Sequence, residues 1–319
     1  MVVGQSNRVN TKQSVLIAGG GGFVGKNMVE ALESEYRICV VDKHIDPDFF
    51  REHGSAQAFE VDLNDSNRIR QILDELKPTY VINLISIVTA ERDLTLFPKM
   101  VEVNLQVLLS LYDVLKDQKQ LRLFVQFGSA EEYGNTHAVP FSEEAREYPA
   151  SPYALIKQLT SNLALMLHRN EGFPAAVVRP GNLFGRYQPS NKLIPYLYNS
   201  LRSGKELLLT PGEQQRDFIH VTDLVEATRK ILENPDKVVG SILNIAYGEG
   251  VTVRQLVDWM KERINSSSRI TYGAIPYRDN EMMQFRCDIS RLRENLGVVF
   301  TRNTFSALDQ YFSEMEEDE

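Results

Sequence analysis

Short apolar runs alternate with longer amphipathic stretches along the first half of the chain. Six apolar runs predict strands at residues 15–18, 37–41, 58–61, 80–84, 121–127 and 175–179. The stretches between them predict helices at 26–34, 66–77, 98–116 and 152–170. Strands that alternate with helices are typical of a parallel sheet with helices on both faces, and unbroken apolar runs suit strands that are buried on both sides. The pattern therefore predicts a doubly wound α/β fold of the Rossmann type.

The regular alternation ends after Arg179, where RPGNLFGRYQPSNKLIP is rich in glycine, proline and asparagine. A helix is predicted at 193–203, and a strand-like pattern returns in GSILNIAYG. The acidic end EMEEDE is expected to be frayed and solvated.

These changes of pattern predict a division of the chain. We expect a flexible tail at 1–13 and a dinucleotide-binding domain at 14–180, to which 219–247 returns. Residues 181–218 and 248–319 are expected to form a smaller α/β substrate-binding region. Such a region would lie at the carboxyl edge of the sheet, where open α/β folds bind ligands.

Composition narrows the class of protein. The 319 residues carry a formal net charge of −8, which argues against a nucleic-acid-binding protein. No stretch is expected to span a membrane, and the polar start MVVGQSNRVNTKQ lacks the apolar core of a secretory signal. Cys39 and Cys287 have no metal-binding spacing, so no metal site is expected. We expect a cytoplasmic enzyme or binding protein.

Four consecutive glycines follow the first predicted strand in VLIAGGGGFVG. Gly19, Gly22 and Gly25 form a G-x-x-G-x-x-G pattern between a strand and a helix. Here the backbone must turn sharply and let a pyrophosphate reach the helix N-terminus. Phe23 and Val24 are expected to pack the base of that helix into the core. The loop is therefore a candidate dinucleotide site.

A carboxylate closes the second predicted strand. Asp42, in ICVVDKH, can accept hydrogen bonds from the hydroxyls of an adenosine ribose and would repel a 2′-phosphate. The pattern therefore indicates NAD rather than NADP. Asp62 and Leu63 follow the third strand and are candidates for contacting adenine, although an ordinary strand end would also explain Asp62.

The segment SPYALIK carries candidates for acid–base chemistry. Tyr153 and Lys157 stand one helical turn apart, on a helix that Ser151 can cap and Pro152 can begin. A neighbouring ammonium stabilises a phenolate and would lower the pKa of Tyr153 toward neutrality. Ser129, in FGSAEEYG after a strand, can share the proton on a substrate oxygen.

Together these motifs resemble the extended short-chain dehydrogenase/reductases that modify nucleotide sugars. The resemblance extends over about residues 14–312 and includes GGGGFVG, SAEEYG, SPYALIK, RPGNLFG, QQRDFIHVTDL and PYRDNE. It implies that Ser129, Tyr153 and Lys157 form the catalytic trio, and that Lys157 also holds the nicotinamide ribose. It further implies a homodimer with the helices at 98–116 and 152–170 in its interface.

The resemblance also implies binding roles outside the trio. Asn104, in VEVNLQVL, matches a helix asparagine that supports the cofactor site. Asn182, in RPGNLFG, matches a contact to the nucleotide diphosphate sugar, and Lys192 is a further candidate for a substrate contact. Arg216 and Arg278 match arginines that grip the substrate's diphosphate, a role that suits guanidinium groups.

The family's shared step is oxidation or reduction at C4 of the sugar. Dehydratases usually carry Asp-Glu after the serine or threonine, whereas this chain has Ala130 and Glu131. Alanine at that place is more like the 4-epimerases, and Glu131 is the best candidate for a further acid or base. Asn83 stands where many relatives carry a histidine, next to Leu84, which is expected to contact the cofactor.

Three functions are compatible with these residues. An epimerase or dehydratase would retain NAD, whereas a reductase of nucleotide-linked 4-keto-6-deoxyhexoses would take a hydride from NADH or NADPH. A non-catalytic dinucleotide-binding protein is the third alternative, and the intact trio argues against it.

Overall fold

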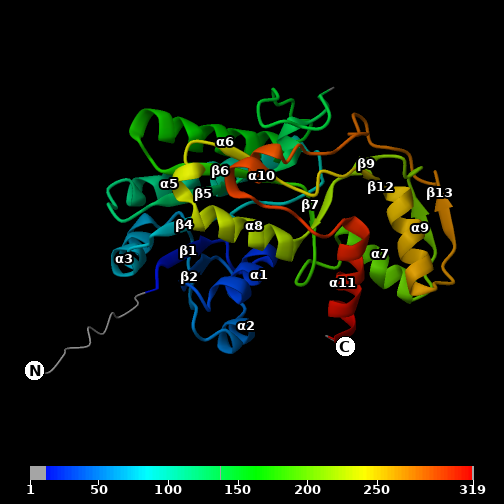
Figure 1. Cartoon of the computed structure of the whole chain (residues 1–319), viewed down its shortest axis with the longest axis horizontal. Helices are drawn as coiled ribbons and strands as arrows, with labels where there is room; N and C mark the ends of the chain where they lie inside the picture. The colour runs from blue at the N-terminus through cyan, green and yellow to red at the C-terminus, as the bar shows by residue number, and fades with distance from the viewer. Residues whose placement is uncertain (1–11, 137, 318–319) are drawn as a thin grey trace, which may run out of the picture.

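The computed structural model describes residues 12–136 and 138–317, and a seven-stranded sheet forms its centre (Figure 1). The strands lie in the order β11 (Ile242–Ile245), β6 (Ala175–Pro180), β5 (Leu123–Phe127), β4 (Tyr80–Asn83), β1 (Ser14–Ala18), β2 (Arg37–Asp42) and β3 (Gln57–Glu60). All six pairings are parallel. The strand order reverses between β1 and β4, which is where open α/β sheets bind ligands. The predicted Rossmann fold is confirmed, and most of the predicted tail lies outside the described residues.

Helices cover both faces of the sheet (Figure 1). One face is covered by α3 (Ser66–Leu76), α5 (Val107–Leu115) and α6 (Pro152–Glu171), and the other by α1 (Phe23–Leu32) and α8 (Val221–Glu233). Successive strand side chains point to opposite faces, so Val15 belongs to one apolar cluster and Leu16 to the other. Both sides of the sheet are therefore buried, as the unbroken apolar runs predict.

A smaller group of elements lies beside the sheet, at the right of Figure 1. It contains α7 (Leu193–Arg202) and α9 (Val253–Ile264). Its short strands pair as β7 (Asn182–Phe184) with β10 (Phe218–His220), β9 (Gln215–Arg216) with β12 (Val251–Thr252), and β8 (Leu207–Leu209) with β13 (Ile270–Tyr272). The helix predicted at 193–203 is present. The strand pairs were not predicted, because runs of two or three residues show no periodicity.

The helix predicted at 98–116 is irregular. Residues 94–115 form one helical stretch made of η1 (Leu94–Leu96), α4 (Phe97–Met100), the π-helical turn η2 (Val101–Gln106) and α5. By length and composition this stretch is apolar enough to cross a membrane, and 28% of its most apolar window is buried. Core helices of soluble proteins meet the same test, so the expectation that no stretch spans a membrane stays a prediction.

The other helices of the described residues are α2 (Pro47–Glu52), η3 (Ala130–Tyr133), η4 (Pro235–Lys237), α10 (Ser290–Leu296) and α11 (Thr304–Glu317).

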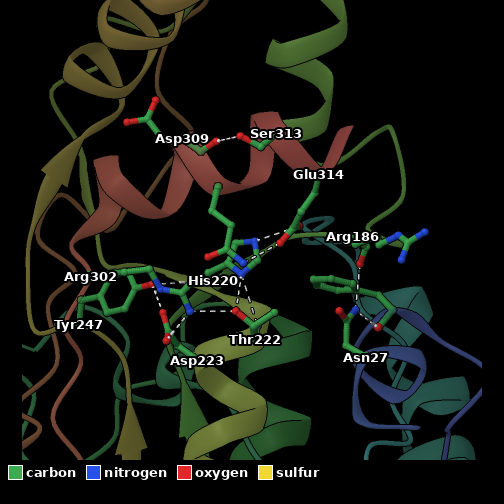
Figure 2. Close-up of polar contacts among 12 residues, drawn as sticks. Asn27, Arg186, His220, Thr222, Asp223, Tyr247, Arg302, Asp309, Ser313 and Glu314 are labelled. Carbon is green, nitrogen blue, oxygen red and sulfur yellow. Dashed lines mark hydrogen bonds and ion pairs between the residues drawn. The ribbon is translucent and has the colours of Figure 1, made fainter. Parts of the chain in front are cut away.

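Buried polar contacts anchor the C-terminal helix α11 (Figure 2). Glu314 points toward the fully buried His220, with 3.4 Å between its Oε2 and the ring Nε2. Just before α11, Arg302 pairs with Asp223 of α8 at 2.6 Å. The acidic end is helical as far as Glu317, so it is not frayed over the described residues; Glu314 has a buried partner, whereas Glu316 and Glu317 are exposed, as predicted. The last two residues lie outside the described part of the chain.

Candidate active site

The glycine loop joins β1 to α1 at the carboxyl edge of the sheet. Gly19 has φ +82°, a left-handed conformation, and a Cβ added to Gly25 would lie 2.4 Å from the Cα of Gly20. At Gly19 and Gly25, therefore, the backbone conformation and the packing of the chain itself explain why the residue is glycine. At Gly22 the nearest atom to an added Cβ is 3.7 Å away, and no side chain caps α1. The first turn of α1 therefore presents backbone N–H groups that suit a phosphate.

The predicted ribose and adenine contacts lie at the same edge. Asp42, at the end of β2, accepts a hydrogen bond from the Gly21 N–H at 2.9 Å. Asp62 follows β3 and pairs with Lys43, with 2.9 Å between Oδ2 and Nζ, while Leu63 is buried. The structure thus brings the two carboxylates and the glycine loop together.

Four other residues predicted to form the cofactor site surround this edge. Phe23 and Val24 begin α1 and pack against the core, and Leu84 follows β4 and packs there too. Asn104 lies in the π-helical turn η2, where its Nδ2 donates to the Met100 carbonyl at 2.9 Å. Within the described residues the buried Oδ1 of Asn104 has no hydrogen-bond partner, so it can accept a hydrogen bond from a ligand.

The three predicted catalytic side chains converge beside this edge. Ser129 lies two residues after the end of β5 and caps η3, while Tyr153 and Lys157 lie one turn apart on α6. As predicted, Ser151 caps that helix. The Ser129 hydroxyl lies close enough to the Tyr153 hydroxyl to lower the pKa of Tyr153. Lys157 donates to the Phe127 carbonyl at 2.7 Å, and its Nζ lies 6.0 Å from the centre of the Tyr153 ring.

Burial governs the titration of this trio. It raises the pKa of Tyr153, and the carboxylate of Glu131 raises it further, whereas the hydroxyl of Ser129 lowers it. Burial also lowers the pKa of Lys157 to about 8, which the carboxylate of Glu132 opposes. The expectation that Lys157 lowers the pKa of Tyr153 is therefore wrong for the chain alone. Desolvation and the carboxylates of Glu131 and Glu132 raise the pKa of Tyr153 instead.

A cavity opens beside Glu131, and its polar lining includes Arg92, Glu131, Ser151, Asn182, Arg216 and Arg278. Asn182 lies on β7, and its buried Oδ1 has no hydrogen-bond partner among the described residues. Lys192 does not line the cavity; its Nζ lies 3.4 Å from the Val88 carbonyl. Three of the four residues predicted to bind substrate outside the trio thus share one cavity.

The cavity combines positive and negative charge. Arg216 forms an ion pair with Glu281 and donates to the Met282 carbonyl at 2.7 Å. Arg278 donates to the Ala90 carbonyl at 3.1 Å, so this arginine connects the loop after β4 to the segment before α10. Two arginines on facing segments can hold the oxygens of a diphosphate between them.

Glu131 faces these arginines. Burial raises its pKa, and the charges of Arg216, Arg92 and Arg278 lower it. Burial outweighs these charges, so the pKa of Glu131 lies above its usual value, a shift that is common among acid–base groups. Sequence reasoning missed Arg92, because no motif surrounds it in the loop after β4.

Known proteins match most of the chain. Residues 15–246 match the model of the NAD dependent epimerase/dehydratase family. The chain is 27% identical over 240 residues to dTDP-glucose 4,6-dehydratase of Haemophilus influenzae, which covers 69% of this chain and 70% of that protein. It is 26% identical over 329 residues to UDP-N-acetyl-alpha-D-glucosaminuronate decarboxylase of Bacillus cytotoxicus, which covers 96% of this chain and 100% of that protein.

The fold also matches solved structures. UDP-glucuronic acid 4-epimerase from Bacillus cereus, in complex with UDP-glucuronic acid and NAD, superposes with a TM-score of 0.86 at 21% identity. The superposition covers 96% of this chain and 100% of that one.

Proposed function

This chain belongs to the NAD dependent epimerase/dehydratase family, and we propose that it uses NAD to move a hydride at C4 of a nucleotide diphosphate sugar. The observation that carries this proposal is the convergence of Ser129, Tyr153 and Lys157 beside a cavity lined with arginines. In this proposal the sheet with residues 14–180 and 219–247 holds the cofactor, and residues 181–218 and 248–319 hold the substrate.

The residues at the carboxyl edge of the sheet fit NAD. The uncapped N-terminus of α1 suits the pyrophosphate, and Asp42 suits the adenosine ribose. Lys157 and the unpartnered oxygen of Asn104 would support the nicotinamide end. When bound, oxidised NAD supplies a hydride acceptor and a positive ring that lowers the pKa of a nearby phenol.

In the proposed mechanism Tyr153 moves the proton that accompanies the hydride. As C4 is oxidised, the C4–H electron pair leaves with the hydride, and the hydroxyl proton passes to the Tyr153 oxygen. Ser129, which lies beside Tyr153, shares that proton, and Lys157, whose Nζ lies 6.0 Å from the centre of the Tyr153 ring, would favour the phenolate form once NAD is bound. In the reverse direction Tyr153 returns the proton to the ketone oxygen.

The cavity would bind the substrate through its diphosphate. Arg216 and Arg278 supply the guanidinium groups, Asn182 supplies an acceptor, and Lys192 adds a positive charge outside the cavity. Glu131 is placed to exchange a second proton with the sugar ring, and such an exchange would extend the reaction from epimerisation to dehydration.

The first experiment identifies the cofactor. The purified protein is denatured, and any nicotinamide dinucleotide that is released is identified and quantified. Near-stoichiometric NAD would support a redox-neutral reaction, to be screened with UDP-, GDP-, CDP- and dTDP-sugars. A protein that holds no cofactor and consumes NADH or NADPH only with a 4-keto sugar would instead be a reductase. A protein that binds neither cofactor when supplied with it would overturn the proposal.

We also propose that the protein is a cytoplasmic homodimer whose subunits meet through the helices at 98–116 and 152–170. In support, Leu109 of α5 and Leu159 of α6 leave 44% and 38% of their surface exposed. The apolar stretch at 94–115 is mostly unburied in a single chain. A second copy would remove this apolar surface from water.

A further inference from the structure

A fully buried carboxylate lies directly beneath the catalytic trio. Glu132 follows Glu131 in η3, but its side chain turns into the protein instead of toward the cavity, and no part of it is exposed. A buried charge is expensive unless several partners compensate it. The partners of Glu132 therefore indicate why the chain keeps it there.

Glu132 has partners on three elements. Its Oε1 accepts hydrogen bonds from the Ser129 N–H at 2.8 Å and from the Ser161 hydroxyl of α6 at 2.9 Å. Its Oε2 accepts a hydrogen bond from Arg179 of β6 at 2.8 Å. The space is tight, because a Cβ added to Gly128 would lie 2.2 Å from Oε1. The carboxylate thus fixes the residue that carries the proposed catalytic hydroxyl.

Arg179 neutralises this charge from the far side. It is fully buried, and its guanidinium carbon lies 4.6 Å from the centre of the Tyr133 ring. Its Nη2 also pairs with Glu147, 2.6 Å from Oε1. Arg179 therefore has two carboxylate partners, and only Glu132 reaches the trio. This difference makes Glu147 a natural control.

The negative charge of Glu132 also raises the pKa of the other two members of the trio, Tyr153 and Lys157. Lys157 faces the Phe127 carbonyl from β5, the Tyr153 ring on its own helix and Glu132 from η3. Glu132 in turn faces Arg179 from β6 and Lys157 from α6. Glu132 is thus the carboxylate that opposes the loss of the Lys157 proton on burial.

We propose that Glu132 is a positioning residue that holds the Ser129 loop against α6 and supplies the negative charge that keeps the Lys157 ammonium in place. This inference rests on the proposed function for its meaning in catalysis. Its test does not depend on turnover, so the two can fail separately.

The test measures the protonation of Lys157 in the folded chain. The free energy of unfolding in urea is measured at pH 6–10 for the native protein and for each variant described below. Every measurement is repeated with Lys157→Met added, and the difference between the two values isolates Lys157. Because the pKa of Lys157 is lowered on folding, the unfolded chain binds more protons, and the difference in stability rises with pH above the folded-state pKa. The pH at which this rise begins therefore reports that pKa.

Glu132→Gln should move the start of the rise to lower pH by about one unit or more, since it removes the opposing charge. Amide hydrogen exchange in residues 128–134 should also become faster. Glu147→Gln, which removes the other carboxylate of Arg179, should change neither readout. If Glu132→Gln does not fold, the double variant Glu132→Gln with Arg179→Met removes both buried charges and replaces it in the same test.

Two results would overturn the inference. One is that the pH at which the stability difference begins to rise is the same in folded Glu132→Gln, or in the double variant, as in the native protein. The other is an equal shift in Glu147→Gln, which would indicate general loosening around Arg179. If the shift is found but the native protein converts no nucleotide sugar, the inference on Glu132 stands and the proposed function fails.

Discussion

Tyr153 is the residue on which the proposed chemistry depends most directly. Tyr153→Phe removes the hydroxyl that would exchange a proton with the sugar, and it leaves the ring in its buried place. We expect turnover to fall by about 10²–10⁴-fold while NAD affinity stays within about twofold. Steady-state kinetics and calorimetric titration with NAD check this. Tyr148→Phe, at a half-exposed tyrosine, is the matched control, and full turnover in Tyr153→Phe would contradict the acid–base assignment.

Glu131 raises the pKa of Tyr153, so removing its charge is a second test at the residue scale. In Glu131→Gln the pKa of Tyr153 should fall, and the limb of the pH–rate profile that Tyr153 controls should move to lower pH. If Glu131 also exchanges a ring proton, the maximal rate should fall by about 10²-fold. The control is Glu144→Gln, a highly exposed carboxylate close by in the chain. An unchanged rate and profile would make Glu131 a loop carboxylate and argue against dehydration.

At the scale of elements, the sheet could be predicted closely from the sequence. A strand buried on both faces needs an unbroken apolar run, and each run in the first half became one strand, such as β5 inside the predicted 121–127. The short strands of the smaller group could not be predicted. Their partners, not their own patterns, fix them, as Asn182 of β7 pairs with Phe218 of β10.

The candidate site divides in the same way. Motifs with fixed spacing, such as Tyr153 and Lys157, could be found because one helical turn separates them. Arg92 and Glu132 could not be found in this way, because a sequence does not show whether a charged side chain is buried or exposed. Only the fold shows that Glu132 turns inward to Arg179 while its neighbour Glu131 faces the cavity.

The N-terminus of α1 gives a prediction at the element scale. Gly22→Ser has room for its side chain, and serine would cap α1 through the N–H groups that a phosphate needs. We expect the free energy of unfolding without cofactor to rise by a few tenths of a kcal/mol. NAD affinity should fall by about tenfold or more. Thermal unfolding and calorimetry check both, with the exposed turn variant Gly54→Ser as control. Undiminished NAD affinity would contradict the proposed pyrophosphate site.

At the scale of the whole molecule, Asp217 joins segments that are far apart in the chain. It is fully buried after β9 and accepts hydrogen bonds from the N–H groups of Tyr247, Gly248 and Cys287 at 3.0–3.1 Å. Tyr247 and Gly248 follow β11 of the sheet, and Cys287 lies between Arg278 and α10 in the segment that follows β13. Asp217 therefore fixes this side of the cavity to the sheet.

Asp217→Asn places an amide nitrogen against N–H donors, so about 2–4 kcal/mol of the free energy of unfolding should be lost. Burial raises the pKa of Asp217 to about 7, while the backbone N–H groups lower it. The folded chain then binds more protons than the unfolded one, and this group's contribution to stability falls as pH rises from about 4 to about 7. Urea unfolding across that range should show that the difference in stability between the native protein and Asp217→Asn becomes smaller as pH rises. Asp236→Asn, at a carboxylate that is 93% exposed, should match the native protein, and a native-like Asp217→Asn would refute the role.

The assembly itself supplies the last prediction. Leu109 of α5 and Leu159 of α6 are exposed on two helices of the same outer layer (Figure 1), where the proposed partner subunit would cover them. Leu109→Glu combined with Leu159→Glu would place two carboxylates from each subunit in that interface, where unpaired charges are strongly disfavoured. We expect the double variant to be a folded monomer at micromolar concentration, with half the native mass by light scattering. Leu208→Glu, at an exposed leucine of β8, should leave the mass unchanged. A native protein that is already monomeric, or a double variant that keeps the native mass, would show that these helices do not form the interface.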